Sequence, residues 1–148
     1  RVFGIAARFA RHDQELDDVC QEIFIKTYHH LGKYRAEAPF EHWLSRIVVR
    51  ACYDLLRKTR HERAQVTLDG IDVHVEDNVG PARAKEILDW ALAKLAPEER
   101  VVITLLEIEE KTVREIAGLT GWSESNVKVR AFRARQKLKE ILETNHER

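Results

Sequence analysis

The stretch TVREIAGLTGWSESNVKVRAFRARQKLKEI, residues 112–141, predicts two helices joined by a tight turn. Thr112 and Glu115 form a T-x-x-E capping box, which favours a helix that starts at the residue after Thr112. Gly121 supplies the backbone freedom that a turn needs, and Ser123 can cap the helix that follows. A short helix, a glycine turn and a longer helix together predict a helix-turn-helix.

The longer helix, expected from Glu124 to about Glu143, has a buried face and a basic face. Its apolar residues recur at the spacing of a seam packed against a neighbour, and they are Val127, Ala131, Ala134, Leu138 and Ile141. The cations on the rest of the helix are Lys128, Arg130, Arg133, Arg135, Lys137 and Lys139. Because like charges at this density repel one another, this face predicts contact with DNA phosphates and base edges. A solvated basic face is the alternative.

Apolar residues at helical spacing also predict helices outside this motif. They are expected over about residues 2–11, 16–31, 82–95 and 97–108, with one more that begins at Pro39. In the helix over residues 16–31 the packed face includes Phe24, Tyr28 and Leu31, and in the helix that begins at Pro39 the residues Phe40 and Trp43 are expected in the core. Such helices can bury a common core as a small bundle.

Residues 63–81 have a different character, with turn formers, several acids and few apolar side chains. This composition predicts an exposed, flexible acidic linker. The fold class that follows is all-α. It has two small helical domains, residues 1–62 and 82–148, joined by the linker, and the second contains the helix-turn-helix.

Charge is distributed unevenly along the 148 residues. The chain has 25 Lys and Arg against 25 Asp and Glu, and a net charge of zero argues against a protein that simply coats nucleic acid. The net charge is +3 over residues 1–60, −7 over residues 61–110 and +5 over residues 111–140. This pattern predicts two segments that meet a polyanion and one between them that avoids it.

Cys20 and Cys52 belong to no CxxC pair and no His/Cys cluster, which favours a reduced, cytosolic protein. No apolar run approaches membrane-spanning length, and no signal peptide is visible. Methionine is absent and the chain begins inside an apparent helix, so we expect residues before Arg1.

Two blocks of this sequence resemble one known family. Residues 115–142, with the ending RARQKL, resemble the fourth conserved region of extracytoplasmic-function sigma factors, and Leu95-Ala96-Pro97 with Arg100 resembles the opening of that domain. The text LDDVCQEIF, residues 16–24, is similar to the start of the second conserved region, and matching residues follow as Tyr34-Arg35, Phe40, Trp43-Leu44 and Arg46-Ile47. The resemblance covers nearly the whole chain except the linker.

The resemblance implies three groups of site residues. Those that dock on the clamp helices of the largest polymerase subunit are Asp17, Asp18, Gln21, Glu22 and Phe24. Those that meet the minus-ten element are Tyr34, Arg35, Arg46, Arg50, Tyr53, Asp54 and Arg57. Those that meet the minus-thirty-five element are Lys128, Val129, Arg130, Phe132, Arg133, Arg135 and Lys137. The acids of the first group also suit a helix N-terminus, which is their alternative role.

The resemblance also implies a function and partners. The protein is expected to bind core RNA polymerase at the clamp helices and flap region, and to direct promoter-specific transcription initiation in the cytoplasm. Promoter DNA and an anti-sigma factor are further implied partners. No catalytic residue, metal, cofactor, small-molecule substrate or membrane insertion is implied. A hypothesis for the acidic linker is that it runs through the polymerase channels and covers cationic surface there.

Two positions depart from the family pattern. Many relatives have Asn where this chain has Arg50, so a minus-ten base preference cannot be transferred to that position. Many have Gly where this chain has Glu110, and the turn there is expected to differ.

Two other classes of protein remain as alternatives. An enzyme is disfavoured because the histidines are scattered, the E-x-x-H at Glu143–His146 stands alone, and His29-His30 lacks partners at ligand spacing. A regulator that binds DNA without polymerase is the nearer alternative. The helical first half, with its basic outer face, argues against it.

Overall fold

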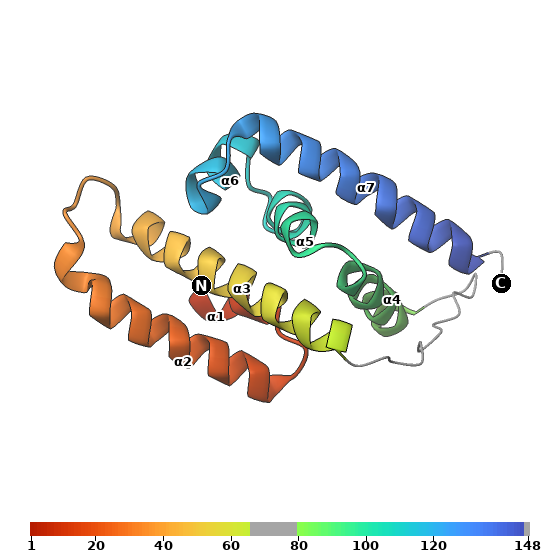
Figure 1. Cartoon of the computed structure of the whole chain (residues 1–148), viewed down its shortest axis with the longest axis horizontal. Coiled ribbons are helices and arrows are strands. Elements are labelled where there is room, and N and C mark those ends of the chain that lie inside the picture. The colour runs from red at the N-terminus through yellow and green to blue at the C-terminus, as the bar shows by residue number, and fades with distance from the viewer. Residues whose placement is uncertain (66–79, 147–148) are drawn as a thin grey trace.

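The computed structural model describes residues 1–65 and 80–146, and the elements in these ranges are helical. The first half contains α1 (Val2–Ala7), α2 (Asp13–His30), the 3-10 turn η1 (Leu31–Lys33) and α3 (Phe40–Gln65). The second half contains α4 (Pro81–Ala93), α5 (Pro97–Ile103), the π-helical turn η2 (Thr104–Ile108), α6 (Val113–Thr120) and α7 (Glu124–His146). Figure 1 shows α3 between α2 and the layer formed by α5 and α6, with α7 on the far side of that layer.

The all-α class is confirmed, but several helix boundaries differ from those predicted. The first helix ends at Ala7 and not near Arg11. The helix expected over residues 97–108 changes at Thr104 into a wider turn, in which Glu109 N donates to Thr104 O at 3.0 Å. The third helix continues to Gln65, so the linker begins later than predicted. The rest of the acidic linker, residues 66–79, lies outside the described residues.

The helix-turn-helix forms through the caps that its sequence predicts. Glu115 N donates to Thr112 Oγ1 at 3.1 Å, and Thr112 N donates to Glu115 Oε2 at 3.2 Å, which completes the capping box. Gly121 ends α6 with a φ of 79°, a left-handed conformation that strongly favours glycine. Asn126 N then donates to Ser123 Oγ at 3.1 Å at the start of α7.

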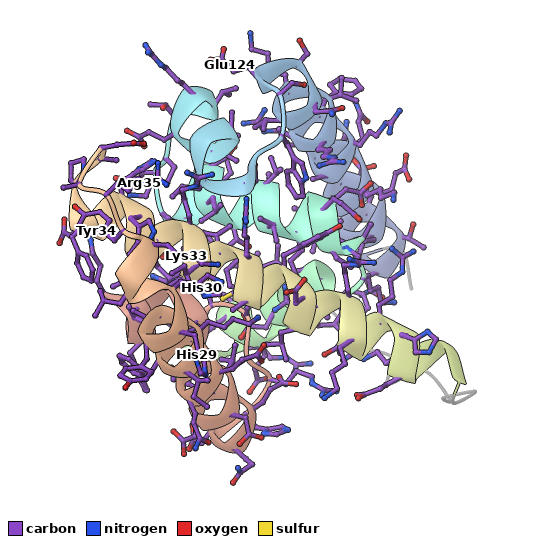
Figure 2. The ribbon with its side chains drawn as sticks, turned by 60° about the vertical axis from the view of Figure 1, so that its left-hand side comes forward. His29, His30, Lys33, Tyr34, Arg35 and Glu124 are labelled. Atoms are coloured by element: carbon purple, nitrogen blue, oxygen red, sulfur yellow. The ribbon has the colours of Figure 1, made fainter. Side chains whose placement is uncertain are left out.

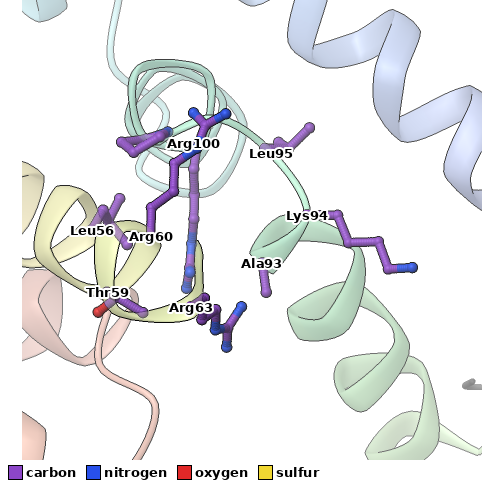
Figure 3. A pocket seen from close by; sticks show the side chains of 9 residues that line it. Leu56, Thr59, Arg60, Arg63, Ala93, Lys94, Leu95 and Arg100 are labelled. Atoms are coloured by element: carbon purple, nitrogen blue, oxygen red, sulfur yellow. The ribbon is translucent and has the colours of Figure 1, made fainter. Parts of the chain in front are cut away.

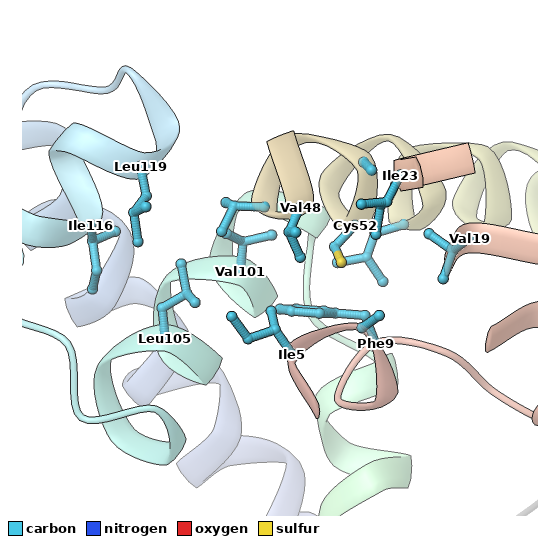
Figure 4. Close-up of a cluster of buried hydrophobic side chains, with 14 of the residues drawn as sticks. Ile5, Phe9, Val19, Ile23, Val48, Cys52, Val101, Leu105, Ile116 and Leu119 are labelled. Atoms are coloured by element: carbon cyan, nitrogen blue, oxygen red, sulfur yellow. The ribbon is translucent and has the colours of Figure 1, made fainter. Parts of the chain in front are cut away.

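The two halves share one hydrophobic core. Phe9 of α1 and Val48 of α3 belong to the same buried cluster as Val101 of α5 and Ile116 of α6, and Figure 4 shows these elements converging. A smaller cluster joins α4, α5 and the middle of α7 through Leu92, Leu95, Ile103 and Ala134. The two helical units are therefore packed together along α3, and we call this packing the closed arrangement.

Three residues predicted on the packed face of α2 are exposed instead. Phe24 is 61% exposed, Tyr28 is 78% exposed and Leu31 is 49% exposed. Ile23 is the last buried residue of α2. In the two turns that follow, the side next to α3 carries Lys26 and His30, while Phe24 and Tyr28 lie on other sides of the helix. Helical spacing thus predicted an apolar stripe on α2, but after Ile23 this stripe turns away from the helices that cover it.

Phe40 and Trp43 were also predicted as core residues, and this is wrong for Phe40, which is 42% exposed. Trp43 is half-buried. Both rings pack with Tyr34, whose ring centroid lies 5.5 Å from that of Phe40 and 5.3 Å from that of Trp43. The fully buried part of α3 starts one turn later at Val48, which leaves these rings in a surface cluster of their own.

Cys20 and Cys52 are buried free thiols. Burial raises the pKa of Cys52 to about 12, so this thiol stays protonated at neutral pH. Within the described residues, no helix is long and apolar enough to cross a membrane. No group of three metal-binding side chains comes together in the same part of the chain.

Candidate nucleic-acid interface

A basic groove runs between α2 and α3. It encloses about 400 Å³ and is lined by Lys26, His30, Trp43, Arg46, Ile47, Arg50 and Asp54. Arg46 and Arg50 lie one helical turn apart on α3 and are both exposed, and Arg57 continues the same side of the helix. A groove with cations along its walls and an aromatic ring at its edge suits a single nucleic-acid strand.

Lys26 and His30 belong to this groove but were not predicted as site residues. Lys26 Nζ lies 2.7 Å from Glu22 Oε1 and 3.7 Å from Asp54 Oδ2, so it links α2 to the basic side of α3. The two residues are four positions apart on α2, the spacing of neighbours on one helical face. That spacing was the signal available in the sequence.

The loop between α2 and α3 is held by hydrogen bonding and ring packing. Tyr34 Oη donates to Ala38 O at 2.7 Å, and Ala36 adopts a φ of 56°, which few non-glycine residues do. Arg35 is exposed beside the half-buried Tyr34. Figure 2 shows Tyr34 and Arg35 at the end of α2, beside the groove.

The outer face of α7 presents a second candidate surface. Lys128 and Arg133 are exposed there, together with Val129, which is 46% exposed, and Phe132, which is 64% exposed. These residues occupy the first half of the helix, after its start at Glu124 (Figure 2). Cations flanking exposed apolar side chains can grip phosphates and contact thymine methyl groups in a major groove.

The remaining cations of α7 are engaged within the molecule. Lys137 Nζ donates to both oxygens of Glu99 at 2.8 and 2.9 Å, and Arg135 forms a close ion pair with Glu107. Glu99 is buried, and its Oε2 also accepts a hydrogen bond from Ala96 N at 3.1 Å. Among the described residues, Lys128 and Arg133 are the cations of this helix with no ion-pair or cation–π partner.

Some of the residues that pack the two halves together are predicted site residues. Tyr53 of α3 donates a hydrogen bond from its hydroxyl to Glu98 Oε1 of α5 at 2.7 Å. Its ring meets that of Trp122 edge to face, with centroids 5.4 Å apart. Arg130 of α7 lies over the same Trp122 ring, with its guanidinium carbon 4.0 Å from the ring centroid. We call these four residues the interdomain cluster.

Arg50 is also contacted by the second half, although its side chain remains exposed. A Cβ added at Gly121 would lie 3.9 Å from Arg50 Nη2, so the turn of the helix-turn-helix sits against this guanidinium. The closed arrangement therefore brings the elements that carry one candidate surface against Tyr53 and Arg50 of the other.

Comparison with known proteins identifies both halves. The model for sigma-70 region 2 matches residues 1–62, and the model for sigma-70 region 4 matches residues 85–138. The RNA polymerase sigma factor CarQ of Myxococcus xanthus is 31% identical over 145 residues, which is 96% of this chain and 83% of CarQ. The extracytoplasmic-function sigma factor SigM of Mycobacterium tuberculosis is 30% identical, over 96% of this chain and 71% of SigM.

The chain belongs to the extracytoplasmic-function sigma factors of the sigma-70 family. Solved sigma factors also share its fold. CnrH, in complex with the cytosolic domain of CnrY, aligns with a TM-score of 0.67 at 28% identity, over 97% of this chain and 81% of CnrH. RpoE of Bartonella quintana, in complex with the anti-sigma factor NepR, gives the same TM-score of 0.67 at 19% identity, over 98% of this chain and 91% of RpoE.

The third predicted group of this sigma factor lies on the outer face of α2. Asp17, Asp18, Gln21 and Glu22 are exposed, and Phe24 is exposed beside them. The uncovered Phe24, together with Ile25 at 52% exposure and Tyr28, adds an apolar patch to these acids. The five residues are thus all accessible, although Asp18 and Glu22 lie on the side of α2 that faces α3, where Glu22 pairs with Lys26.

The interdomain cluster of this sigma factor also shifts two pKa values. Burial and the hydrogen bond to Glu98 raise the pKa of Tyr53. Burial disfavours the charged form of Glu98, but the hydrogen bond from Tyr53 outweighs it with help from Arg130, so the pKa of Glu98 is below its usual value. The neutral phenol and the ionised carboxylate are therefore the forms that suit the closed arrangement.

Proposed function

We propose that this sigma factor binds core RNA polymerase in an open arrangement and reads a promoter through two surfaces that the closed arrangement partly covers. Its family makes it a promoter-specificity subunit for transcription initiation. The observation that carries the finer proposal is the interdomain cluster, because it engages predicted DNA contacts of both halves, Tyr53 and Arg130, in contacts within the molecule.

The face of α2 is the proposed polymerase-docking surface. Its acids are exposed next to an apolar patch formed by Phe24, Ile25 and Tyr28. An uncovered group of large apolar side chains rimmed by charges is typical of a protein–protein interface. The clamp helices of the largest polymerase subunit are the proposed partner.

The groove between α2 and α3 is the proposed minus-ten surface. Arg46, Arg50 and Arg57 can follow the backbone of an opened strand, and Tyr53 or Trp43 can stack on an unpaired base. Tyr34 and Arg35, at the end of the groove, are placed to hold a base that leaves the stack. Asp54 and Lys26 set the charge on the groove wall.

The outer face of α7 is the proposed minus-thirty-five surface. Lys128, Val129, Phe132 and Arg133 face outward and can reach base edges in the major groove. Arg130, Arg135 and Lys137 would hold phosphates once they leave their partners Trp122, Glu107 and Glu99.

An anti-sigma factor is the proposed regulator. RpoE of Bartonella quintana was solved in complex with the anti-sigma factor NepR, and CnrH in complex with the cytosolic domain of CnrY. A partner that spans the two halves would favour the closed arrangement and so keep Tyr53 and Arg50 away from DNA. We further propose that the protein acts in the cytoplasm, with its polymerase and promoter, and that it has no enzymatic activity of its own.

Reconstitution with core polymerase and run-off transcription over a promoter library tests this function. The expected result is initiation at promoters that share two sequence elements, with tight promoter binding only when core polymerase is present. Promoter binding by the free protein at equal affinity would instead support a regulator that acts without polymerase.

Glu22→Ala tests the docking surface in the same system. The expected result is weaker binding to core polymerase, because the variant removes an exposed charge from the proposed interface. Glu86→Ala is the matched control, since Glu86 is an exposed acid on α4 that pairs with Arg83. Equal affinity of the Glu22→Ala and wild-type proteins for core polymerase would remove Glu22 from the interface.

A further inference from the structure

A small cavity lies between the two halves, away from the groove and from the outer face of α7. It encloses about 120 Å³, and its walls come from α3 on one side and from α4 and α5 on the other. The charged side chains that line it are all cationic: Arg60 and Arg63 from α3, Lys94 from the end of α4, and Arg100 from α5. Figure 3 shows Arg60 and Arg100 side by side, with Arg63 close to them.

Arg100 is the most deeply placed of these cations. Its Nε is buried and has no hydrogen-bond partner in the described part of the chain. Its Nη2 reaches one backbone oxygen, Arg8 O, at the long distance of 3.5 Å. A buried guanidinium with an unused donor is costly, so an acceptor at this position would be strongly favoured.

The charged neighbours of Arg100 act in both directions. Burial lowers the pKa of Arg100 most, Asp89 opposes this, Arg63 lowers the pKa by repulsion, and Glu15 raises it. Neither Asp89 nor Glu15 is among the residues that line the cavity. Glu15 is already held by Arg11, whose Nη2 donates to its Oε1 at 2.7 Å. The charge that gathers around the cavity is therefore left without a matching carboxylate on its walls.

The four cations are not equivalent. Lys94 turns away from the cavity, with Nζ 4.1 Å from the centroid of the Trp90 ring (Figure 3). Arg60 and Arg63 form no ion pair with any described residue. Three guanidinium groups from both halves of the molecule thus remain for a ligand, and we call Arg60, Arg63 and Arg100 the arginine cluster.

We propose that the arginine cluster binds a phosphate group, either as free phosphate or pyrophosphate or as the phosphate end of a nucleotide. Guanidinium groups bind phosphate with paired, charge-assisted hydrogen bonds. A phosphate monoester carries a charge of about −1.5 to −2, which balances three clustered cations better than one carboxylate does. A cavity of about 120 Å³ holds roughly the volume of four water molecules, which suits one phosphate group, so the base and sugar of a nucleotide would lie outside it.

A ligand here would act on the arrangement of the two halves. Because Arg60 and Arg63 lie on α3 and Arg100 on α5, the complete cluster exists when these helices are packed together. A phosphate bound by all three favours the closed arrangement, since ligands stabilise the state that binds them. This inference concerns phosphate binding and does not depend on the proposed promoter contacts.

The first experiment measures binding to the full-length chain at constant ionic strength. Phosphate, pyrophosphate and ATP are titrated separately by calorimetry, and the radius of gyration is measured by small-angle scattering with and without each. The expected result is a rise in Tm with ligand and a smaller or unchanged radius of gyration. Binding of pyrophosphate alone assigns the site to the phosphate group, and binding of ATP alone assigns it to nucleotides. A Kd weaker than about 1 mM for all three overturns the proposal.

Substitutions then locate the site. Arg60→Gln and Arg63→Gln change exposed side chains, and each is expected to weaken binding by about tenfold or more. Arg100→Lys keeps the charge of the buried residue but removes its forked donors, and it too is expected to weaken binding. Arg83→Gln is the control, because it makes the same charge change at the other end of α4. Equal weakening by Arg63→Gln and Arg83→Gln would show diffuse attraction of anions and overturn the assigned site.

Discussion

The two helices that carry the proposed DNA contacts, α3 and α7, are both basic but are used differently in the closed arrangement. On α3, the part that would meet DNA is partly covered, because Tyr53 is held by Glu98 and Trp122 and Arg50 lies against the turn at Gly121. On α7, the outer face stays open, and the cations near its inner edge are neutralised by Glu99 and Glu107.

This difference indicates where regulation can act. The open face of α7 leaves Arg133 and Phe132 accessible whether or not the halves separate. The minus-ten surface becomes fully accessible when α5 and the turn at Gly121 move off α3. Separation of the halves should therefore control the opening of promoter DNA more than recognition of the upstream element.

We expect the largest loss of stability from Trp122→Ala, because it removes the ring that joins Tyr53 of α3 to Arg130 of α7. We expect a loss of about 2 to 3 kcal/mol in the free energy of unfolding, since a half-buried aromatic ring and its edge and cation contacts disappear. Chemical denaturation measures the loss. Small-angle scattering should show a larger radius of gyration.

Trp90→Ala is the control for this change, because Trp90 lies on α4, its ring packs with Lys94 at the end of that helix, and it is not part of the interdomain cluster. It should lower stability without changing the radius of gyration of the folded protein. An unchanged radius for Trp122→Ala as well would contradict the idea that this ring holds the halves together.

Arg133→Ala tests the open face of α7. If Arg133 makes a bidentate contact with a base, the variant should lose about 1 to 3 kcal/mol of discrimination between promoters with and without the correct upstream element. The stability of the protein should not change, because Arg133 is exposed and has no ion-pair partner among the described residues. Holoenzyme binding to a panel of upstream sequences measures the effect, and an equal loss on every sequence would make Arg133 a phosphate contact.

Local signals in the sequence were enough to predict the helix-turn-helix. The capping box at Thr112, the left-handed Gly121 and the Ser123 cap each depend on residues within one turn, and all three are present. The wide turn η2 left no such signal, and neither did the packing of α3 against α5 and α6. Periodicity shows which face of a helix is apolar, but it does not show which element covers that face or how far along it.

The exposed end of α2 and the aromatic cluster at Tyr34 illustrate the same limit. Phe24, Tyr28 and Phe40 continue an apolar stripe in sequence, yet the neighbouring helices do not cover them and they are exposed. Lys26 and His30 became site residues because α3 lies beside them. The candidate site residues of each helix could be predicted from the sequence of that helix. The groove and the closed arrangement could not, because each depends on which elements pack against one another.

Tyr53→Phe is a finer change to the covered surface, because it removes one hydrogen bond and keeps the ring against Trp122. We expect a loss of about 1 kcal/mol in the free energy of unfolding at neutral pH. The pKa of Glu98 is lower in the folded protein than its usual value of 4.5, so this contribution is present above that value and is lost as the pH falls through the folded-state pKa.

The pH dependence identifies the interaction. Between about pH 5 and pH 3 the wild-type protein should lose more stability than Tyr53→Phe, so the two curves of unfolding free energy against pH should converge in acid. The raised pKa of Tyr53 affects stability at alkaline pH. There the free energy of unfolding decreases as the pH rises above 10, the usual pKa of a tyrosine. Parallel curves across the acidic range would show that the Tyr53–Glu98 bond contributes nothing to the closed arrangement.

Glu110→Gly should give the smallest effect. It changes a turn in the second half of the molecule, the half that covers part of α3. Glu110 has a φ of 52° in the turn between η2, which carries Glu107, and α6, which packs on α3. Glu110 thus holds a left-handed conformation that glycine adopts without strain. The left-handed conformation costs a residue with a Cβ about 1 to 2 kcal/mol, and glycine loses part of that gain through its freer unfolded chain.

The expected net result of Glu110→Gly is a gain of about 0.5 to 1 kcal/mol in the free energy of unfolding, measured by chemical denaturation. Glu110→Ala separates the effect of the backbone from the loss of the carboxylate, because alanine keeps the Cβ and should give no such gain. Glycine should also leave the radius of gyration unchanged, since it relieves strain within the second half and alters no contact with α3. A gain of the same size for alanine would assign the effect to charge, and the turn at Glu110 would then be unstrained.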